Sequence, residues 1–395
     1  MQKSEQLHDG KRQRVDVVAS TPTIENSERK GEAFPVMSEQ ELALLLVPFT
    51  TSPKFGAELR QTLAQQGVAV VTGILTSKEL EGFEMLWQDE RQQEPPHPLG
   101  SPDPIRWQSS HGEFMWRARL HPRVRASFAS AFNVEESSLT ASADVLFWAD
   151  KCTPTAEFNK EWLHVDQNHL TGLTHLCYQG ALYVWPADAS SSTTVVWPGS
   201  HLEFYNQLLH DPYTQERATL TDSLSIRYGH FVAVNSMSDQ SLKRAAIGGA
   251  RRVPVPAGAL LLWDSRTVHQ GWQGGPRLAA TICWEPRSRL LPGAAARKLL
   301  MAAAGIPSVH SPSEGRFNPA VSSRRGEGAK LSRPSMRPYA VSRSLPDAEW
   351  KQLWAEWAGK GWIEDLVNES WAKRLLADDA ALKRALRPEV LEALL

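Results

Sequence analysis

Cysteine is scarce in this chain of 395 residues. The three cysteines (Cys152, Cys177 and Cys283) are odd in number, widely spaced and free of any C-x-x-C pair. This pattern disfavours a disulfide framework or a zinc site built from thiolates, and it suits a reducing compartment. We therefore expect a fold held together by a hydrophobic core, not by cross-links.

Long hydrophobic runs and an excess of either charge are also missing. No apolar run approaches membrane-spanning length, and the N-terminal MQKSEQLHDGKRQR lacks the apolar core of a signal peptide. The 43 Lys and Arg almost balance the 44 Asp and Glu, so no global field points to nucleic acid or membrane. We expect a soluble cytoplasmic protein, in which KRQR (residues 11–14) is a weak nuclear signal or merely solvated charge.

The first 140 residues divide into a polar tail and a helical region. Residues 1–36 are polar and poor in aromatics, which predicts a disordered tail. Two capping-box patterns follow, Ser38 to Glu41 and Thr76 to Glu79, and each predicts the start of a helix. The remaining expectations here are a helix over 54–66, a β-rich run over 67–75, and a Pro-rich loop over 91–107 of the kind that often serves as a lid.

Residues 140–290 change to short strand-like runs broken by turns. Many short strands without alternating helices favour a sandwich or jelly roll over a parallel α/β sheet. The expected strands are ADVLFWA, EWLHVDQ, THLCYQGALYVW, STTVVWPG, HFVAVN, ALLLWDS and LAATICWE. We expect one mostly β domain with flanking helices over 37–310, whose core is this strand-rich region.

Beyond the strands the chain turns helical again. LPGAAARKLLMAAAG predicts a helix that stops at Gly305. Residues 311–343 resemble a loop and form a basic linker with seven Arg or Lys. Residues 344–395 form a Trp-rich helical extension, because Trp350, Trp354 and Trp357 share one helix face and should pack on the core. ALKRALRPEVLEALL predicts one or two short helices at its end.

The motif His164-Val165-Asp166 carries the strongest chemical signal. In a strand, side chains at i and i+2 point to the same side, so His164 and Asp166 can bind one ion without backbone strain. Alone the pair is weak, because H-x-D recurs by chance and such a histidine is often a hydrogen-bonded core residue. A second histidine would complete the two-His, one-carboxylate triad of non-haem Fe(II) oxygenases.

His269 is the best candidate for that third ligand. It follows the apolar strand ALLLW and a turn at Asp264-Ser265, where a ligand at the mouth of a barrel should lie. The competing histidines are less well placed: His201 has no cation at a useful distance, His169 and His175 fall on a loop, and His310 lies outside the strands.

Arg277 lies eight residues after His269 and opens the next strand. A diacid that chelates iron at one end needs its other carboxylate held, and a guanidinium fork suits that task better than a lysine. Thr281, on the same strand, could add a hydroxyl contact. The alternative is that Arg277 is an ordinary surface charge beside a turn.

Together these motifs resemble the phytanoyl-CoA dioxygenase-like (PhyH-like) branch of the Fe(II)/2-oxoglutarate-dependent oxygenases. The matching pieces span about residues 65–290: GVAVVTGILTSKELEGF, WLHVDQNH, YQGALYVW, TTVVWPGSH and GALLLWDSRTVHQGW. The resemblance implies a double-stranded β-helix, a cupin-like jelly roll with N-terminal and C-terminal helices. It also implies that His164, Asp166 and His269 bind Fe(II) and that Arg277 pairs with 2-oxoglutarate. Gln179 is a weaker cofactor or substrate contact.

The same resemblance implies a reaction. O2 and 2-oxoglutarate would give succinate and CO2 while an unactivated C–H bond of the substrate is oxidised. Related halogenases carry a small residue where this chain has Asp166, so halogenation is disfavoured, while hydroxylation, desaturation and ring closure stay open.

Three hypotheses about function fit the sequence. The first is a hydroxylase of a small organic substrate. The second is the same chemistry on a nucleic acid or protein, reached through the basic linker and the KRQR tail, and the third is a silent binding protein on the same fold. The complete set of ligands disfavours the third.

Overall fold

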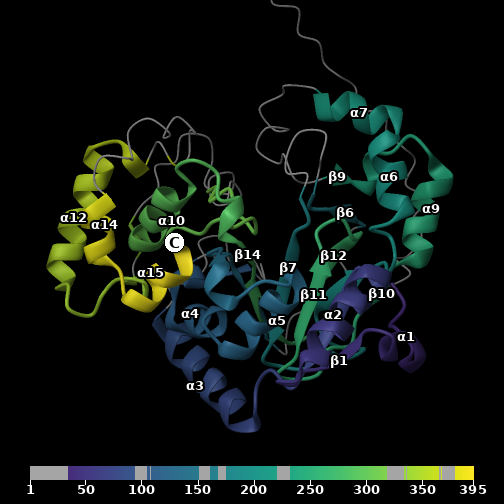
Figure 1. Cartoon of the computed structure of the whole chain (residues 1–395), viewed down its shortest axis with the longest axis horizontal. Helices are drawn as coiled ribbons and strands as arrows, with labels where there is room; N and C mark the ends of the chain where they lie inside the picture. The colour runs from purple at the N-terminus through teal and green to yellow at the C-terminus, as the bar shows by residue number, and fades with distance from the viewer. Residues whose placement is uncertain are drawn as a thin grey trace, which may run out of the picture. The chain divides into compact units, whose positions relative to one another are not determined.

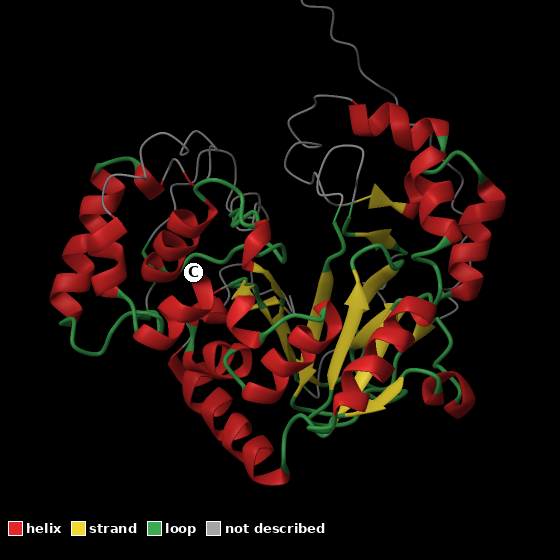
Figure 2. Cartoon of the chain, in the orientation of Figure 1, coloured by secondary structure: helices red, strands yellow, loops and turns green. Residues whose placement is uncertain are grey.

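Two β-sheets lie face to face in the centre of the computed structural model, and helices cover their outer sides (Figure 1, Figure 2). The structure describes residues 34–93, 105–106, 108–150, 161–167, 175–219, 232–317, 333–334, 336–363, 366 and 379–395. Residues 33–395 form one compact unit. Residues 1–33, most of the Pro-rich loop, and residues 318–332 and 335 of the basic linker lie outside the described residues. Residues 34–36 were predicted to belong to the disordered tail, but they are ordered, because Phe34 is buried against Trp272 and Val36 forms a bridge with Arg252.

The larger sheet has seven strands. Their spatial order is β1 (Leu46–Pro48), β2 (Val68–Thr72), β11 (Leu260–Asp264), β7 (Tyr178–Tyr183), β13 (Arg277–Ile282), β5 (Leu146–Ala149) and β3 (Ile105–Arg106). All its neighbouring strands are antiparallel except β1 and β2. β1 and β2 are joined by α2, as a parallel connection requires.

The smaller sheet has five antiparallel strands. They run in the order β10 (Arg251–Arg252), β8 (Thr193–Val196), β12 (His269–Trp272), β6 (His164–Val165) and β9 (Val232–Ala233). A separate pair is formed by β14 (Trp284–Pro286) and β4 (Leu139–Ala141). This confirms the expected jelly-roll class; the two sheets do not close into a barrel.

Strand alternation divides the core into layers. In β11, Leu260 and Leu262 pack into the outer cluster against the helices, whereas Leu261 and Trp263 pack between the sheets. On the other sheet, Val165 of β6 and Leu163 just before it face an outer cluster under α6 (Glu203–His210) and α9 (Gln240–Gly249). Because side chains alternate along a strand, the intervening His164 faces the space between the sheets. His269 of β12, Gln179 of β7 and Arg277 of β13 lie on the inner faces of their strands for the same reason.

The N-terminal helices follow the predicted capping signals. α1 (Glu39–Ala43) and α3 (Ser77–Gln93) both begin with a complete capping box, in which Glu41 and Glu79 accept from the backbones of Ser38 and Thr76. α1 is shorter than ELALLL predicts, because the chain leaves the helix after Ala43 to form β1 beside β2. The expected helix over 54–66 is confirmed as α2 (Pro53–Gln66).

Further helices pack on both sides of the sheets (Figure 1). They are α4 (Glu113–Arg119), α5 (Pro122–Phe132), α7 (Pro212–Thr219), α10 (Ala294–Ala304), α12 (Asp347–Gly359), α14 (Asp379–Ala385) and α15 (Pro388–Leu394). α10 ends at Gly305 in the left-handed conformation, as predicted. The tryptophan stripe on α12 is buried, and the indoles of Trp350 and Trp354 donate to the carbonyls of Ala303 and Ala304 at the end of α10.

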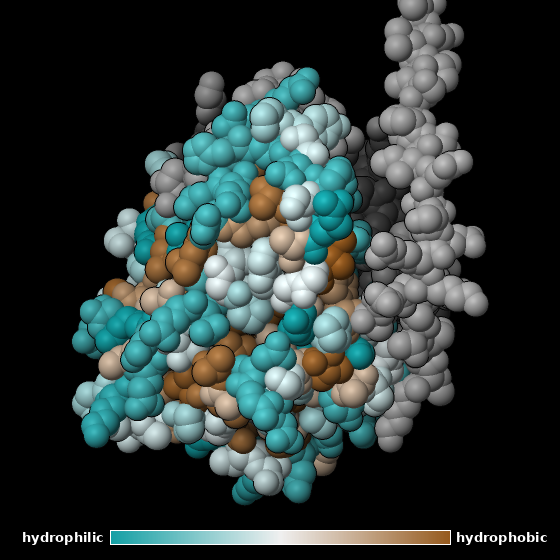
Figure 3. Space-filling model, turned by 90° about the vertical axis from the view of Figure 1, so that its right-hand side faces the viewer, coloured by the Kyte–Doolittle hydropathy of each residue, from teal (hydrophilic) through white to brown (hydrophobic). Residues whose placement is uncertain are grey.

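The surface offers few apolar features. In Figure 3, hydrophilic and hydrophobic residues are interspersed over the face that it shows. None of the helices in the described part of the chain is long and apolar enough to cross a membrane. The exposed large hydrophobic residues are scattered along the sequence, as is normal at a protein surface: Leu44, Leu46, Met85, Trp162, Leu202, Tyr213, Ile247 and Leu291.

Candidate active site

The two histidines of the predicted triad are paired residues on neighbouring strands. His164 of β6 and His269 of β12 are directly opposite each other in antiparallel register, and their rings are 4.3 Å apart between centroids. Asp166 follows β6 and its backbone N–H donates to Ser265, which places its carboxylate next to both rings. The structure therefore brings together His164, Asp166 and His269, which lie 105 positions apart at the extremes.

The ligand atoms of the triad converge. The Nε2 atom of His164 lies 3.5 Å from Asp166 Oδ1, and the Nε2 atom of His269 lies 3.1 Å from Asp166 Oδ2. Each Nδ1 atom faces a backbone carbonyl, that of Trp162 at 3.1 Å and that of Thr267 at 2.9 Å. These hydrogen bonds favour the tautomer with the proton on Nδ1, which leaves both Nε2 lone pairs directed at the carboxylate.

This arrangement fits a divalent cation. Two neutral imidazole lone pairs facing a carboxylate repel it unless a positive charge lies between them. Burial, aided by the neighbouring His269, lowers the pKa of His164, so its ring is neutral near pH 7. Burial raises the pKa of Asp166, but in the metal-free chain His164, His310 and the hydrogen bonds from both triad histidines hold it well below the usual range; metal binding would displace the Nε2 protons that make those bonds. Neutral imidazoles with an ionised carboxylate are the ligand set expected for Fe(II).

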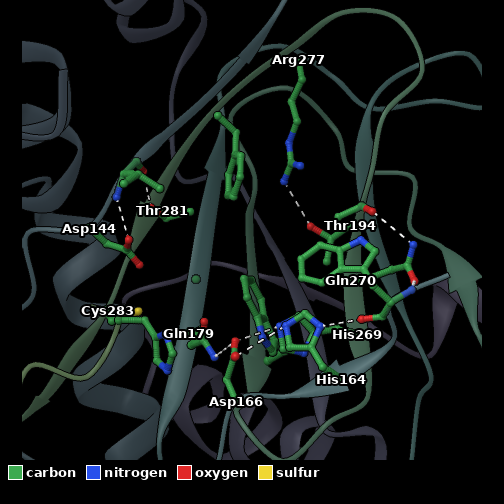
Figure 4. Close-up of a pocket in the computed structure, with 17 residues that line it drawn as sticks. Asp144, His164, Asp166, Gln179, Thr194, His269, Gln270, Arg277, Thr281 and Cys283 are labelled. Atoms are coloured by element: carbon green, nitrogen blue, oxygen red, sulfur yellow. Dashed lines mark hydrogen bonds and ion pairs between the residues drawn. The ribbon is translucent and has the colours of Figure 1, made fainter. Parts of the chain in front are cut away.

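Asp166 is held in place by Gln179. The side-chain amide of Gln179, on β7, donates to Asp166 Oδ2 at 3.0 Å and to the hydroxyl of Ser265 at 3.3 Å. Asp166 is thus oriented by contacts with β7 and with Ser265, the residue that follows β11. The triad borders a pocket, and the side chain of Gln179 lines this pocket too (Figure 4). Gln179 contacts the Asp166 carboxylate and does not reach the opposite end of the pocket.

Arg277 occupies the other end of that pocket (Figure 4). Its guanidinium is buried and donates from Nη2 to the hydroxyls of Tyr183 at 2.9 Å and Thr194 at 3.2 Å. The rings of Phe147 and Tyr183 lie 4.6 Å and 5.1 Å from its Cζ atom. Within the described residues no carboxylate lies within 4.0 Å of Arg277, and its Nε atom has no hydrogen-bond partner there. A buried cation with this environment favours an anionic ligand.

Thr281 lies on the same side of β13 as Arg277 and lines the pocket. Its hydroxyl donates to the carbonyl of Val145, so it can offer a ligand only its oxygen lone pairs. The structure thus places all six of the predicted site residues around one cavity. These are His164, Asp166, His269, Arg277, Gln179 and Thr281.

Sequence reasoning missed several other residues in or beside this cavity. Strand alternation from Gln179 would have placed Tyr183 on the inner face, but Thr194 carries no comparable signal. His310, dismissed because it follows the strands, lines the pocket, as does the buried carboxylate Asp144. His201 lies elsewhere, with Nε2 3.3 Å from the carbonyl of Ala64, and His169 falls outside the described residues.

The pocket has room for a small molecule. Its volume is about 160 Å³, comparable to an engineered cavity of roughly 150 Å³ that takes up benzene. On one wall lie Asp144, Thr281 and Cys283, and on the other lie Thr194 and Gln270 (Figure 4). Trp162 borders the pocket and stacks on His164, with ring centroids 4.5 Å apart.

This fold and this site together define an oxygenase of the 2-oxoglutarate-dependent type. The chain belongs to the phytanoyl-CoA dioxygenase (PhyH) family, which matches residues 63–274, more than half of its length. Its cofactor is Fe(II), and its co-substrates are 2-oxoglutarate and O2. The predicted family and enzyme class are therefore confirmed. No curated protein sequence matches the chain.

Several solved structures are similar in fold. The epimerase SnoN, in complex with Fe3+, alpha ketoglutarate and nogalamycin RO, is 17% identical, with 60% of this chain and 85% of that chain covered and a TM-score of 0.42. HygX from Streptomyces hygroscopicus, with nickel and 2-oxoglutarate bound, is 17% identical over 58% of this chain and 86% of that chain, with a TM-score of 0.38. GIG2 from Candida albicans is 12% identical over 80% and 85%, with a TM-score of 0.45.

Proposed function

We propose that this enzyme oxidises an unactivated C–H bond of a small organic substrate, with hydroxylation as the outcome. The observation that carries the proposal is the convergence of two Nδ1-anchored imidazoles on one ionised carboxylate. In this proposal His164 and His269 bind Fe(II) through Nε2 and Asp166 binds it through a carboxylate oxygen. With Fe(II), 2-oxoglutarate and O2 bound, such a site couples conversion of 2-oxoglutarate to succinate and CO2 with oxidation of the substrate.

The protein's own groups would bind and orient the reactants. Arg277 is proposed to hold the distal carboxylate of 2-oxoglutarate, because its guanidinium is buried, lacks a carboxylate partner among the described residues and shares the cavity with the triad. Tyr183 and Thr194 fix its orientation. Gln179 is proposed as a positioning residue, which holds the Asp166 carboxylate at the orientation a metal requires.

The substrate is proposed to lie against Asp144, Cys283 and His310. Asp144 and Cys283 border the cavity at some remove from Arg277 (Figure 4), and His310 also lines it. A bound co-substrate would therefore leave this wall accessible. Burial raises the pKa of Asp144, while the nearby His310 opposes the rise. In either protonation state an oxygen of Asp144 can accept a hydrogen bond from an amine or hydroxyl. A small substrate is favoured over a macromolecule because the cavity is narrow and lies between the sheets.

Substrate-independent conversion of 2-oxoglutarate to succinate tests the proposal. Purified protein with Fe(II), O2 and 2-oxoglutarate should form succinate. His164→Ala, Asp166→Ala and His269→Ala should each abolish succinate formation. Absence of succinate from wild-type protein that demonstrably binds Fe(II) would overturn the catalytic assignment. Full activity and iron binding in His269→Ala would show that another residue supplies the third ligand. A screen for metabolites that stimulate succinate release would then identify the substrate.

A further inference from the structure

A second group of metal-binding side chains lies outside the triad. His175 and Cys177 precede β7, and Glu285 lies in β14. The antiparallel register of β13 and β7 pairs Ile282 with Gly180, so the chain that continues past each of them brings Glu285 next to Cys177. One nitrogen, one sulfur and one carboxylate oxygen from the three residues all lie within 4.8 Å of one another.

The geometry centres on one carboxylate oxygen. The Sγ atom of Cys177 lies 2.8 Å from Glu285 Oε1, and the Nε2 atom of His175 lies 3.6 Å from the same oxygen. The other oxygen, Oε2, accepts from the backbone N–H of Ser313 at 2.8 Å. Glu285 and Cys177 are buried, whereas the side chain of His175 is 28% exposed and so lies between the cluster and solvent.

Hydrogen bonding alone leaves this cluster incompletely satisfied. The thiol and the imidazole approach the same oxygen, and only the thiol is within hydrogen-bond distance. The Nε2 atom of His175 is buried, and its one contact among the described polar groups is the long ion pair with Glu285, beyond hydrogen-bond distance. Buried polar atoms are almost always paired, so one that points at a thiol and a carboxylate is evidence for a missing partner.

We propose that His175, Cys177 and Glu285 bind a divalent metal ion of the zinc type, separate from the iron of the triad. Imidazole, thiolate and carboxylate are the three protein ligands that zinc uses, and a fourth position would be left for water. The thiolate makes the site softer than the nitrogen and oxygen donors of the triad, so the two sites would select different metals. On binding, the thiol loses its proton to solvent and its sulfur binds the ion.

The charges around the cluster suit such an ion. One thiolate and one carboxylate neutralise a divalent cation, which reduces the free energy needed to bury each of the three charges. One buried amine, that of Lys298, interacts electrostatically with Glu285, and burial lowers the pKa of Lys298 to about 7. Its ammonium donates to the hydroxyl of Thr140, so it is directed at another partner. Lys298 therefore does not occupy the position proposed for the metal.

The proposed ion would brace one wall of the active-site pocket. It would join the start of β7, which carries Gln179, to β14 and, through Ser313, to the segment that carries His310. Gln179 and His310 both line the pocket. We therefore expect the ion to stabilise the fold around the site without taking part in 2-oxoglutarate turnover.

The absence of a C-x-x-C pair does not conflict with this site. That absence disfavours zinc sites with several thiolates, but a site with one thiolate needs only one cysteine. The ligands come from two segments more than 100 residues apart, and only the fold brings them together. Cys283, the other buried cysteine in the described chain, lines the triad's pocket and offers a matched control.

Cobalt titration of the full-length, metal-depleted protein tests the proposal. Co²⁺ should bind at two sites per chain, and only the site with Cys177 should produce a near-ultraviolet thiolate-to-cobalt charge-transfer band. Cys177→Ser should lose the band and one equivalent of metal, whereas Cys283→Ser should keep both. His164→Ala should lose one equivalent while the band persists, because its ligand belongs to the other site.

Two outcomes would overturn the second site. One is wild-type protein that binds cobalt without a charge-transfer band, and the other is a band that disappears in Cys283→Ser but not in Cys177→Ser. If Cys177→Ser does not fold, His175→Gln serves instead, because this side chain is partly exposed and its loss should weaken cobalt binding at least tenfold. Succinate formation by iron-loaded Cys177→Ser separates this proposal from the catalytic one, since it should continue when the charge-transfer band is lost.

Discussion

The guanidinium of Arg277 donates to the hydroxyl of Tyr183 at 2.9 Å, and both side chains lie between the two sheets. This contact ties the residue proposed to bind 2-oxoglutarate to β7, the same strand that carries Gln179. One strand therefore supports both ends of the pocket.

Replacement of Arg277 should weaken binding of 2-oxoglutarate. Arg277→Gln removes a buried charge whose hydrogen bonds to a carboxylate are worth about 1.5–3 kcal/mol, so the KM for 2-oxoglutarate should rise by at least tenfold. Arg277→Lys retains the charge but not the fork and should give an intermediate value. The measurement is succinate formation against 2-oxoglutarate concentration. An unchanged KM in both variants would rule out this role for Arg277.

Replacement of Gln179 should weaken metal binding through Asp166. Gln179→Ala removes the 3.0 Å hydrogen bond to Asp166 Oδ2, and loss of such a supporting bond lowers metal affinity about 10- to 100-fold. Gln179→Glu places a like charge beside the carboxylate and should alter binding further. Titration with Mn(II) measures the affinity, while thermal unfolding of the metal-free protein measures fold stability. A loss of stability with unchanged Mn(II) affinity would make Gln179 merely structural.

Asp144 should affect the substrate but not the co-substrate. Asp144→Asn keeps the shape of the side chain and removes the buried carboxyl group that lines the cavity. Succinate formation without substrate should stay within a few-fold of wild type, whereas stimulation by the cognate substrate should fall about tenfold or more. The comparison uses any metabolite that the screen identifies. Equal loss of both activities would place Asp144 in the iron or 2-oxoglutarate site.

Acid should destabilise the fold through His111. Burial, with the nearby Arg119, lowers the pKa of His111 from 6.5 to about 3, although its Nε2 atom is hydrogen-bonded to the Ile306 carbonyl at 2.8 Å. Between pH 6.5 and 3, His111 is protonated in the unfolded chain but not in the folded chain. The free energy of unfolding should therefore fall as the pH decreases through this range, by up to about 1.4 kcal/mol per pH unit.

His111→Gln should flatten that part of the pH dependence, because glutamine can keep a donor for Ile306 and does not titrate. Urea unfolding at pH 7, 6, 5 and 4 measures the free energy of unfolding. Steps of about one pH unit resolve the slope expected from one proton. If wild type and His111→Gln lose stability in parallel, the acid sensitivity comes from other groups.

Alanine at two left-handed glycines should give different losses of stability. Gly67 ends α2 with φ +68°, and a Cβ there would lie 2.4 Å from the His201 ring and 2.5 Å from Thr267 Oγ1. Gly73 has φ +75° and nothing within 4 Å of its added Cβ. Gly73→Ala should cost about 1–2 kcal/mol from backbone strain, and Gly67→Ala should cost about 1–3 kcal/mol more from overpacking. Equal losses in urea unfolding would show that the surroundings of Gly67 yield to the methyl group.

The grouping of the three triad residues could be predicted from the sequence because they lie next to recognisable strands. His164 and Asp166 follow the two-residue period, and His269 follows the strong apolar strand Leu260–Asp264. β12 itself was not predicted, because HQGW has neither an apolar alternation nor a β-branched residue. Its strand structure depends on pairing with β6 and β8 on either side, and a local pattern does not report this.

Other parts of the site depend on contacts between distant segments. His310 reaches the pocket from beyond the strands, and Glu285 meets Cys177 across 108 positions. α1 ends early for a similar reason, since Leu46 gains a parallel partner in Val70 that local helix propensity does not include. Tertiary pairing decides these features, so the sequence alone could not predict them.

The register pairing of His164 with His269 makes the active site unusually sensitive to changes in loop length. Residues 265–268 alone connect β11 to β12, and one inserted or deleted residue there would shift β12 by one position against β6. Such a shift exchanges the two faces of a strand, so His269 would point away from the cavity. The gene could therefore lose its activity through a single in-frame codon insertion that leaves every catalytic residue in the sequence.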